Sequence, residues 1–161
     1  MIYRIREQFW SWGNDFSIQD QDGNERFFVD GKAFSWGDQL SLLDAHRNEV
    51  AFIEQKLWSF KPRYRIHIGG RLFAEVVKEW SWFEKRFTLD VPGPNDYTIE
   101  GSFWSHEFVF LRRGAVVATV SKTFWAWTDS YGVEIVEGED DVAILCACIV
   151  IDQVLHDDRD D

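Results

Sequence analysis

The sequence is poor in the residues that several protein classes require. Among its 161 residues are only two cysteines, Cys146 and Cys148, and only 17 basic against 28 acidic residues. On a helix, positions two apart point to roughly opposite sides, so these thiols cannot form a disulfide with each other, and they indicate a reducing, cytoplasmic setting. No further cysteine and no well-spaced histidine pair joins them in a CxC metal site. The net charge of −11 argues against nucleic acid as a partner.

Long apolar segments are also missing. The longest uninterrupted apolar run, VAILCACIVI at 142–151, has ten residues, whereas a membrane-spanning helix needs about 18–20. The start, MIYRIREQFWSWG, has neither the apolar region nor the small-residue cleavage site of a secretory signal. We therefore expect a cytoplasmic protein without a transmembrane span. The length suits one domain, and a hydrophobic content of 45% excludes disorder over most of the chain.

Aromatic residues are abundant, and they occur in a repeat. Nine tryptophans and fourteen phenylalanines favour strands. Six segments each combine a polar residue, a bulky aromatic corner and an alternating apolar stretch. The polar positions are 24, 24, 22, 22 and 22 residues apart, at Gln8, Lys32, Lys56, Lys78, Glu100 and Lys122.

Within each segment the apolar residues alternate with polar ones, which is the period of a β-strand. Tyr64, Ile66 and Ile68, for example, alternate with Arg65 and His67. Turn signals such as Asp-Gly-Asn at 22–24 and Gly-Gly at 69–70 separate the segments. Two strands in each of six units predict a mainly β fold of about twelve strands. An antiparallel meander closed into a barrel removes the unpaired edges.

The apolar run at 142–151 fits inside such a barrel. Twelve tilted strands close with a radius of roughly 12 Å, which leaves space for one helix after the inward side chains are placed. A helix that is apolar on all sides must be enclosed, and Asp140 or Asp141 can cap its N-terminus. We predict one domain over 1–156, with this central helix at about 141–156, and an acidic tail at 157–161. A buried central strand is the alternative for this run.

Several motifs resemble those of a known family. FWSWGNDFSIQDQDG, FFVDGKAFSWGD, NEVAFIEQK, VATVSK and TDSYGVEIVEGEDD are similar to bacterial members of the LURP-one-related family, which belongs to the tubby C-terminal-like superfamily together with the phospholipid scramblases. The resemblance covers essentially the whole chain. It implies a closed twelve-stranded barrel threaded by a C-terminal helix. Its functional implications are fewer: bacterial members are largely uncharacterised, and tubby proteins bind phosphoinositides.

Three surface features are candidate sites. An acidic segment precedes the helix where scramblases have a proposed calcium-binding segment, but it lacks the spacing of an EF-hand loop and also suits a helix cap. Arginines on one strand face suit lipid head groups, as in tubby, or are solvated outer residues. The aromatic corners suit a membrane or partner interface, or they cover the barrel ends. The acidic segment contains Glu137, Glu139, Asp140 and Asp141, and the candidate head-group residues are Lys61, Arg63 and Arg65. The tryptophans of the aromatic corners are Trp10, Trp12, Trp36, Trp58, Trp80, Trp82, Trp125 and Trp127.

No catalytic constellation stands out. The histidines are His46, His67, His106 and His156. Asp152 and His156 share a helix face and can hydrogen-bond, but no nucleophile or metal motif accompanies them. We expect a monomeric, non-enzymatic binding domain without a cofactor, whose partner is a protein or a lipid surface. A scramblase-like, calcium-responsive lipid-binding protein is the alternative.

Overall fold

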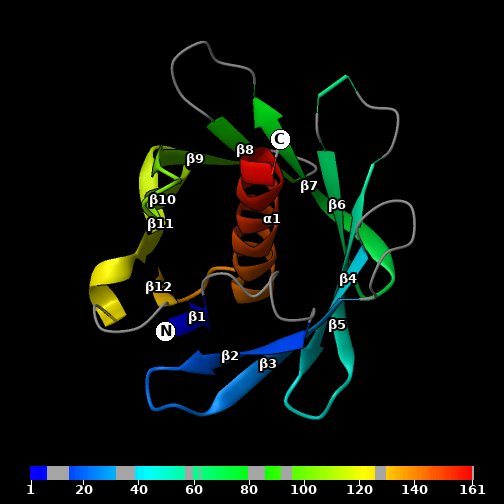
Figure 1. Cartoon of the computed structure of the whole chain (residues 1–161), viewed down its shortest axis with the longest axis vertical. Coiled ribbons are helices and arrows are strands. Elements are labelled where there is room, and N and C mark those ends of the chain that lie inside the picture. Colours follow the sequence, from blue (N-terminus) through cyan, green and yellow to red (C-terminus); the bar gives the residue numbers. More distant parts are fainter. Residues whose placement is uncertain are drawn as a thin grey trace.

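The computed structural model describes residues 1–6, 15–31, 39–56, 60–61, 63–79, 86–91, 96–125 and 130–160. These residues form twelve strands, a short 3-10 helix and one long α-helix (Figure 1). The elements in chain order are β1 (Ile2–Arg6), β2 (Asp15–Asp20), β3 (Glu25–Gly31), β4 (Gln39–Asp44), β5 (Glu49–Gln55), β6 (Arg63–Ile68), β7 (Arg71–Glu79), β8 (Arg86–Asp90), β9 (Tyr97–Ser102), β10 (Glu107–Arg112), β11 (Ala115–Ser121), η2 (Lys122–Trp125), β12 (Ser130–Ile135) and α1 (Asp141–Asp160).

The strands form a closed antiparallel barrel in which each strand pairs with its neighbours in sequence. Pairing of β1 with β12 closes the ring, from Ile2 opposite Glu134 to Arg6 opposite Ser130. The predicted twelve-stranded meander is therefore confirmed. Because neighbouring strands run in opposite directions, alternate connections lie at the same end. We call the end with the β1–β2, β3–β4, β5–β6, β7–β8, β9–β10 and β11–β12 connections the corner end, and the other the turn end.

The turns confirm the repeat at the level of single hydrogen bonds. At the β2–β3 turn, Asp20 Oδ1 accepts hydrogen bonds from the amides of Asp22 and Asn24, and Asp20 Oδ2 accepts one from the Asn24 side chain at 3.2 Å. Asp44 and Asn48, each 24 residues further on, make the equivalent contacts at the β4–β5 turn, again with a side-chain bond of 3.2 Å. Both hairpins also carry a register shift just before the turn. The sequence repeat is thus a repeat of hairpin structure.

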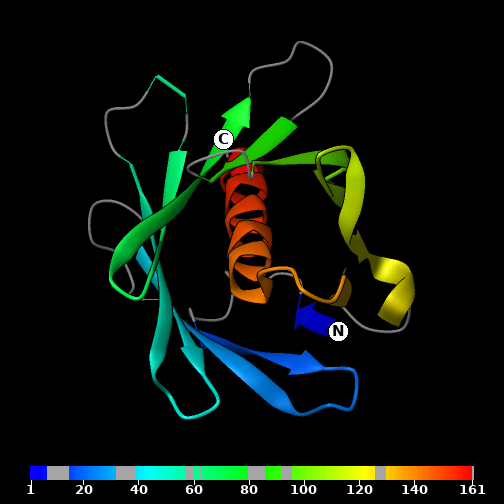
Figure 2. The ribbon, with the colours of Figure 1, turned by 180° about the vertical axis from the view of Figure 1, so that it is seen from behind.

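Helix α1 occupies the centre of the barrel in both views (Figures 1 and 2). Residues 143–151 are 0% exposed, so the run is enclosed on all sides, and the alternative of a central strand is excluded. Asp140 caps the helix, because its Oδ1 accepts a hydrogen bond from the amide of Ala143 at 3.0 Å. The helix continues to Asp160 rather than ending near 156, so helical backbone extends into the predicted acidic tail.

Contacts at its two ends give the direction of α1. Tyr3, at the turn end, donates to Asp141, and His106, in the β9–β10 connection, contacts Asp152. The helix therefore runs from the turn end to the corner end. Both thiols within it are buried, and this burial raises the pKa of Cys146 and of Cys148. Among the described residues, no helix combines the length and the apolar character needed to cross a membrane.

Candidate functional site

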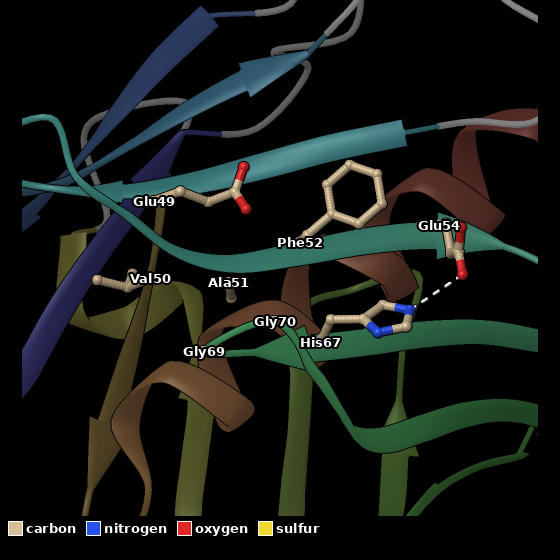
Figure 3. A pocket seen from close by; sticks show the side chains of 8 residues that line it. All are labelled: Glu49, Val50, Ala51, Phe52, Glu54, His67, Gly69 and Gly70. Carbon is tan, nitrogen blue, oxygen red and sulfur yellow. Dashed lines mark hydrogen bonds and ion pairs between the residues drawn. The ribbon is translucent and has the colours of Figure 1, made fainter.

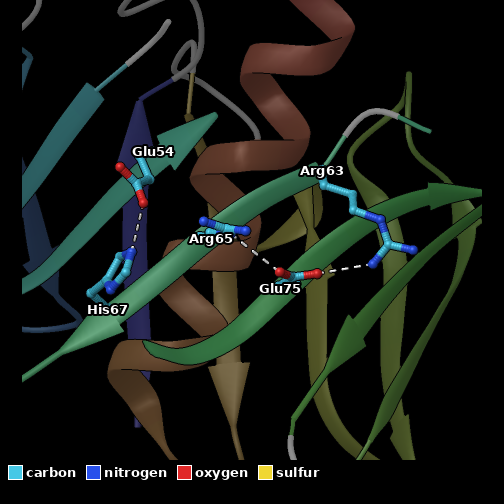
Figure 4. Close-up of polar contacts among 5 residues, drawn as sticks. All are labelled: Glu54, Arg63, Arg65, His67 and Glu75. Atoms are coloured by element: carbon cyan, nitrogen blue, oxygen red, sulfur yellow. Dashed lines mark hydrogen bonds and ion pairs between the residues drawn. The ribbon is translucent and has the colours of Figure 1, made fainter. Parts of the chain in front are cut away.

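A ladder of charged side chains crosses the outer face of β5, β6 and β7 (Figure 4). Arg63 and Arg65 lie on this face because they alternate with the buried residues Tyr64 and Ile66. Both guanidinium groups converge on Glu75, with Arg63 Nη1 at 2.9 Å from Oε2 and Arg65 Nε at 3.4 Å from Oε1. The expected shared face of the two arginines is confirmed.

These ion pairs change the electrostatic character of the predicted head-group residues. Lys61, the third of them, is paired with Glu79. Burial alone would raise the pKa of the Glu75 carboxyl, but the hydrogen bond and charge of Arg63, with help from Arg65, lower it below its usual range. All three cations are therefore engaged by carboxylates, Arg63 and Arg65 by Glu75 and Lys61 by Glu79, and we call this set of five residues the paired ladder.

A pocket of about 240 Å³ lies beside this ladder, toward the turn end (Figure 3). Its lining comes from β5, β6 and the β6–β7 turn: Glu49, Val50, Ala51, Phe52, Glu54, His67, Gly69 and Gly70. Phe52 and His67 are paired in register across β5 and β6, with ring centroids 6.1 Å apart. His67 Nε2 lies 2.9 Å from Glu54 Oε1. The carboxylates of Glu49 and Glu54 lie on either side of the Phe52 ring in Figure 3.

The acidic segment before α1 is held by contacts within the protein. Glu139 accepts hydrogen bonds from Tyr97 Oη at 2.9 Å and from Arg112 Nη2 at 2.6 Å. Burial is the main cause, and the hydrogen bond to Glu139 the second, of a pKa of Tyr97 that is raised to about 12. As described above, Asp140 caps the helix and Asp141 bonds to Tyr3, whereas Glu137 is exposed. No group of three or more metal-ligating side chains occurs in the part of the chain that the structure describes.

Most of the aromatic corners fall outside the described residues. This holds for Trp10, Trp12, Trp36, Trp58, Trp80, Trp82 and Trp127, and for the side chain of Trp125. Two exposed aromatic side chains lie in corner-end connections that the structure describes. Phe60, in the β5–β6 connection, is 95% exposed, and Trp104, in the β9–β10 connection, is 42% exposed.

The structure also contains a buried polar cluster that the sequence did not predict. Asp152 Oδ1 lies 2.8 Å from His106 Nε2, and Asp152 Oδ2 accepts a hydrogen bond from Tyr131 Oη at 2.5 Å. The rings of His106 and Tyr131 stack with centroids 4.5 Å apart. The sequence places Asp152 on the same helix face as His156, where the two can hydrogen-bond, but the side chain of His156 lies outside the described residues. No local spacing signals the observed contact, since its partners are 46 and 21 positions apart.

Comparisons with known proteins agree with this architecture. A family model described as LURP-one-related matches residues 1–152. The chain is 36% identical over 157 residues to the uncharacterized protein YxjI of Bacillus subtilis (strain 168), covering 98% of this chain and 95% of that protein. An X-ray structure of a protein from Arabidopsis thaliana superposes with a TM-score of 0.68 at 19% identity, over 96% of this chain and 90% of that one, and so shares the fold. On this evidence, the chain belongs to the LURP-one-related family.

Proposed function

We propose that this chain is a non-enzymatic binding domain that acts through the exterior of its barrel. The main support is the filled lumen, because α1 takes the space where a barrel of this size would hold a ligand. The buried titratable pair, His106 and Asp152, is only 8% and 9% exposed, and the two side chains contact each other. Their burial among the described residues argues against their use in catalysis.

For the binding surface, we propose that the corner end contacts a lipid surface. Phe60 carries this proposal: it is 95% exposed and is followed directly by Lys61. An aromatic side chain beside a long polar one suits the boundary between water and lipid: the ring enters the apolar layer, and the Lys61 amine keeps its contact with Glu79 at the polar surface. Trp104 adds a second exposed aromatic ring at the same end.

Vesicle flotation tests this proposal. We expect the protein to float with zwitterionic vesicles more than with anionic ones, because its net charge of −11 is repelled by an anionic surface. Phe60→Ser should reduce flotation. Val116→Ser is the matched control, since Val116 is 50% exposed but is the second residue of β11, which follows a turn at the opposite end. Absence of flotation under every condition would reject lipid contact and leave a protein as the partner.

Calcium in the same assay tests the scramblase-like alternative. That alternative requires Glu139, Asp140 or Asp141 to exchange a present contact for the ion, since each of them accepts a hydrogen bond in the described structure. A calcium-dependent increase in flotation that is lost in Glu139→Gln would support a calcium-responsive protein. Flotation that is unchanged by calcium would argue against it.

A further inference from the structure

We propose that the pocket between β5, β6 and the β6–β7 turn binds a cationic side chain, preferentially arginine, of a partner protein. This pocket is on the side of the barrel toward the turn end, whereas the proposed lipid contact is at the corner end. The inference therefore goes beyond the proposed function and is tested separately from it.

The pocket exists because one turn carries no side chains. Gly69 and Gly70 have φ angles of +60° and +76°, a backbone conformation that joins two antiparallel strands tightly and that strongly favours glycine. A Cβ atom added to either residue would meet no atom within 4 Å. One wall of the pocket is therefore bare backbone beside open space, and a long side chain can approach β5 from this side.

The aromatic part of the pocket suits a flat cation. Phe52 is half-buried on the outer face of β5, and its register partner His67 extends the aromatic surface onto β6. A guanidinium group placed over an aromatic face is attracted by the negative charge density of the ring. Arginine is favoured over lysine because its planar group stacks on a ring while it donates several hydrogen bonds within its own plane.

Two carboxylates complete the site. Glu49 Oε2 accepts a hydrogen bond from Ser41 Oγ at 2.8 Å, and Glu54 Oε1 is 2.9 Å from His67. Each carboxylate can accept further hydrogen bonds with its other oxygen. Arg65 is the register partner of Glu54, but its guanidinium turns toward Glu75 on β7 (Figure 4). Arg65 is thus paired outside the pocket and does not occupy the site beside Glu54.

The charge of the whole protein favours the same kind of partner. A net charge of −11 attracts a basic protein segment over long range and repels an anionic one. The occupant is therefore an arginine presented by a basic segment. In the paired ladder beside the pocket, by contrast, Glu75 is already engaged by Arg63 and Arg65, and Glu79 by Lys61.

Titration with labelled peptides tests the proposal on the full-length protein. Three peptides share one Gly/Ser sequence and carry arginine, lysine or citrulline at the same positions; citrulline has the shape of arginine without its charge. We expect affinity to fall from arginine to lysine to citrulline. In amide NMR spectra, the arginine peptide should shift the resonances of Phe52, Gly69 and Gly70.

Variants distinguish the pocket from a general effect of charge. Glu54→Gln should weaken arginine-peptide binding about fivefold, as expected for a partly exposed charged contact. Glu134→Gln, an equal change of charge on an exposed residue of β12, should leave it unchanged. Phe60→Ser should also leave it unchanged. The proposal is overturned if the arginine peptide does not bind, if citrulline binds equally well, or if Glu54→Gln and Glu134→Gln have the same effect.

Discussion

Removal of the Tyr131 hydroxyl should destabilise the protein, because among the described residues this group and the His106 ring are the hydrogen-bond partners of the buried carboxylate of Asp152. Tyr131 is 0% exposed and Asp152 only 9% exposed, so water does not readily replace the lost donor. A hydrogen bond to a charged group contributes about 1.5–3 kcal/mol. For Tyr131→Phe we therefore expect the free energy of unfolding to fall by about 2 kcal/mol, and the Tm by about 4–8 °C for a chain of this length.

Urea unfolding followed by circular dichroism measures this effect. Ser102→Ala is the control, since it also removes a hydroxyl, but one that bonds to Ser105 on an exposed surface; it should change the free energy by less than about 0.5 kcal/mol. His106→Gln combined with Tyr131→Phe then gives a double-mutant cycle, in which we expect the two changes to be coupled through Asp152. A Tyr131→Phe variant as stable as Ser102→Ala would refute the reasoning, because the buried bond would then contribute nothing.

Three further outcomes follow from the packing and the charges. Ala147→Phe should prevent folding, because Ala147 is 0% exposed on a helix enclosed by the barrel; soluble yield and circular dichroism test this, and an unchanged Tm would contradict the central position of the helix. Gly101→Ala should lower the free energy of unfolding by about 3 kcal/mol or more, since its Cβ would lie 2.5 Å from the Glu107 carbonyl oxygen at a φ of +138°; retention of wild-type stability in urea would count against this close approach. Tyr97 should stabilise the fold below pH 10 and lose this contribution as the pH rises toward its folded pKa of about 12, because a raised pKa favours the neutral phenol. Between these pH values, the free energy of unfolding in urea should decline less steeply for Tyr97→Phe than for the wild type. Equal declines would argue against the role of Tyr97.

Some features of the candidate sites follow from residues close together in the sequence, and others depend on which strands pair. Arg63 and Arg65 could be placed on one outer face from the sequence, because strand alternation is a local rule. Their shared contact with Glu75 could not be predicted, because it depends on the pairing of β6 with β7 in one particular register. The same limit applies to the pocket, whose aromatic pair, Phe52 and His67, lies across two strands.

The sequence by itself determined the class of fold. Period-two alternation, turn signals and a six-fold repeat predicted twelve antiparallel strands, and the all-apolar run predicted the enclosed helix, because these patterns reflect the geometry of single strands and helices. Only the tertiary structure decided which charges meet. Closure of the barrel around α1 brings Asp152 to His106 and Tyr131, and Glu139 to Tyr97 and Arg112, across separations that no local rule spans. Long-range polar contacts depend on register and side-chain direction together, and both are settled only when the barrel closes.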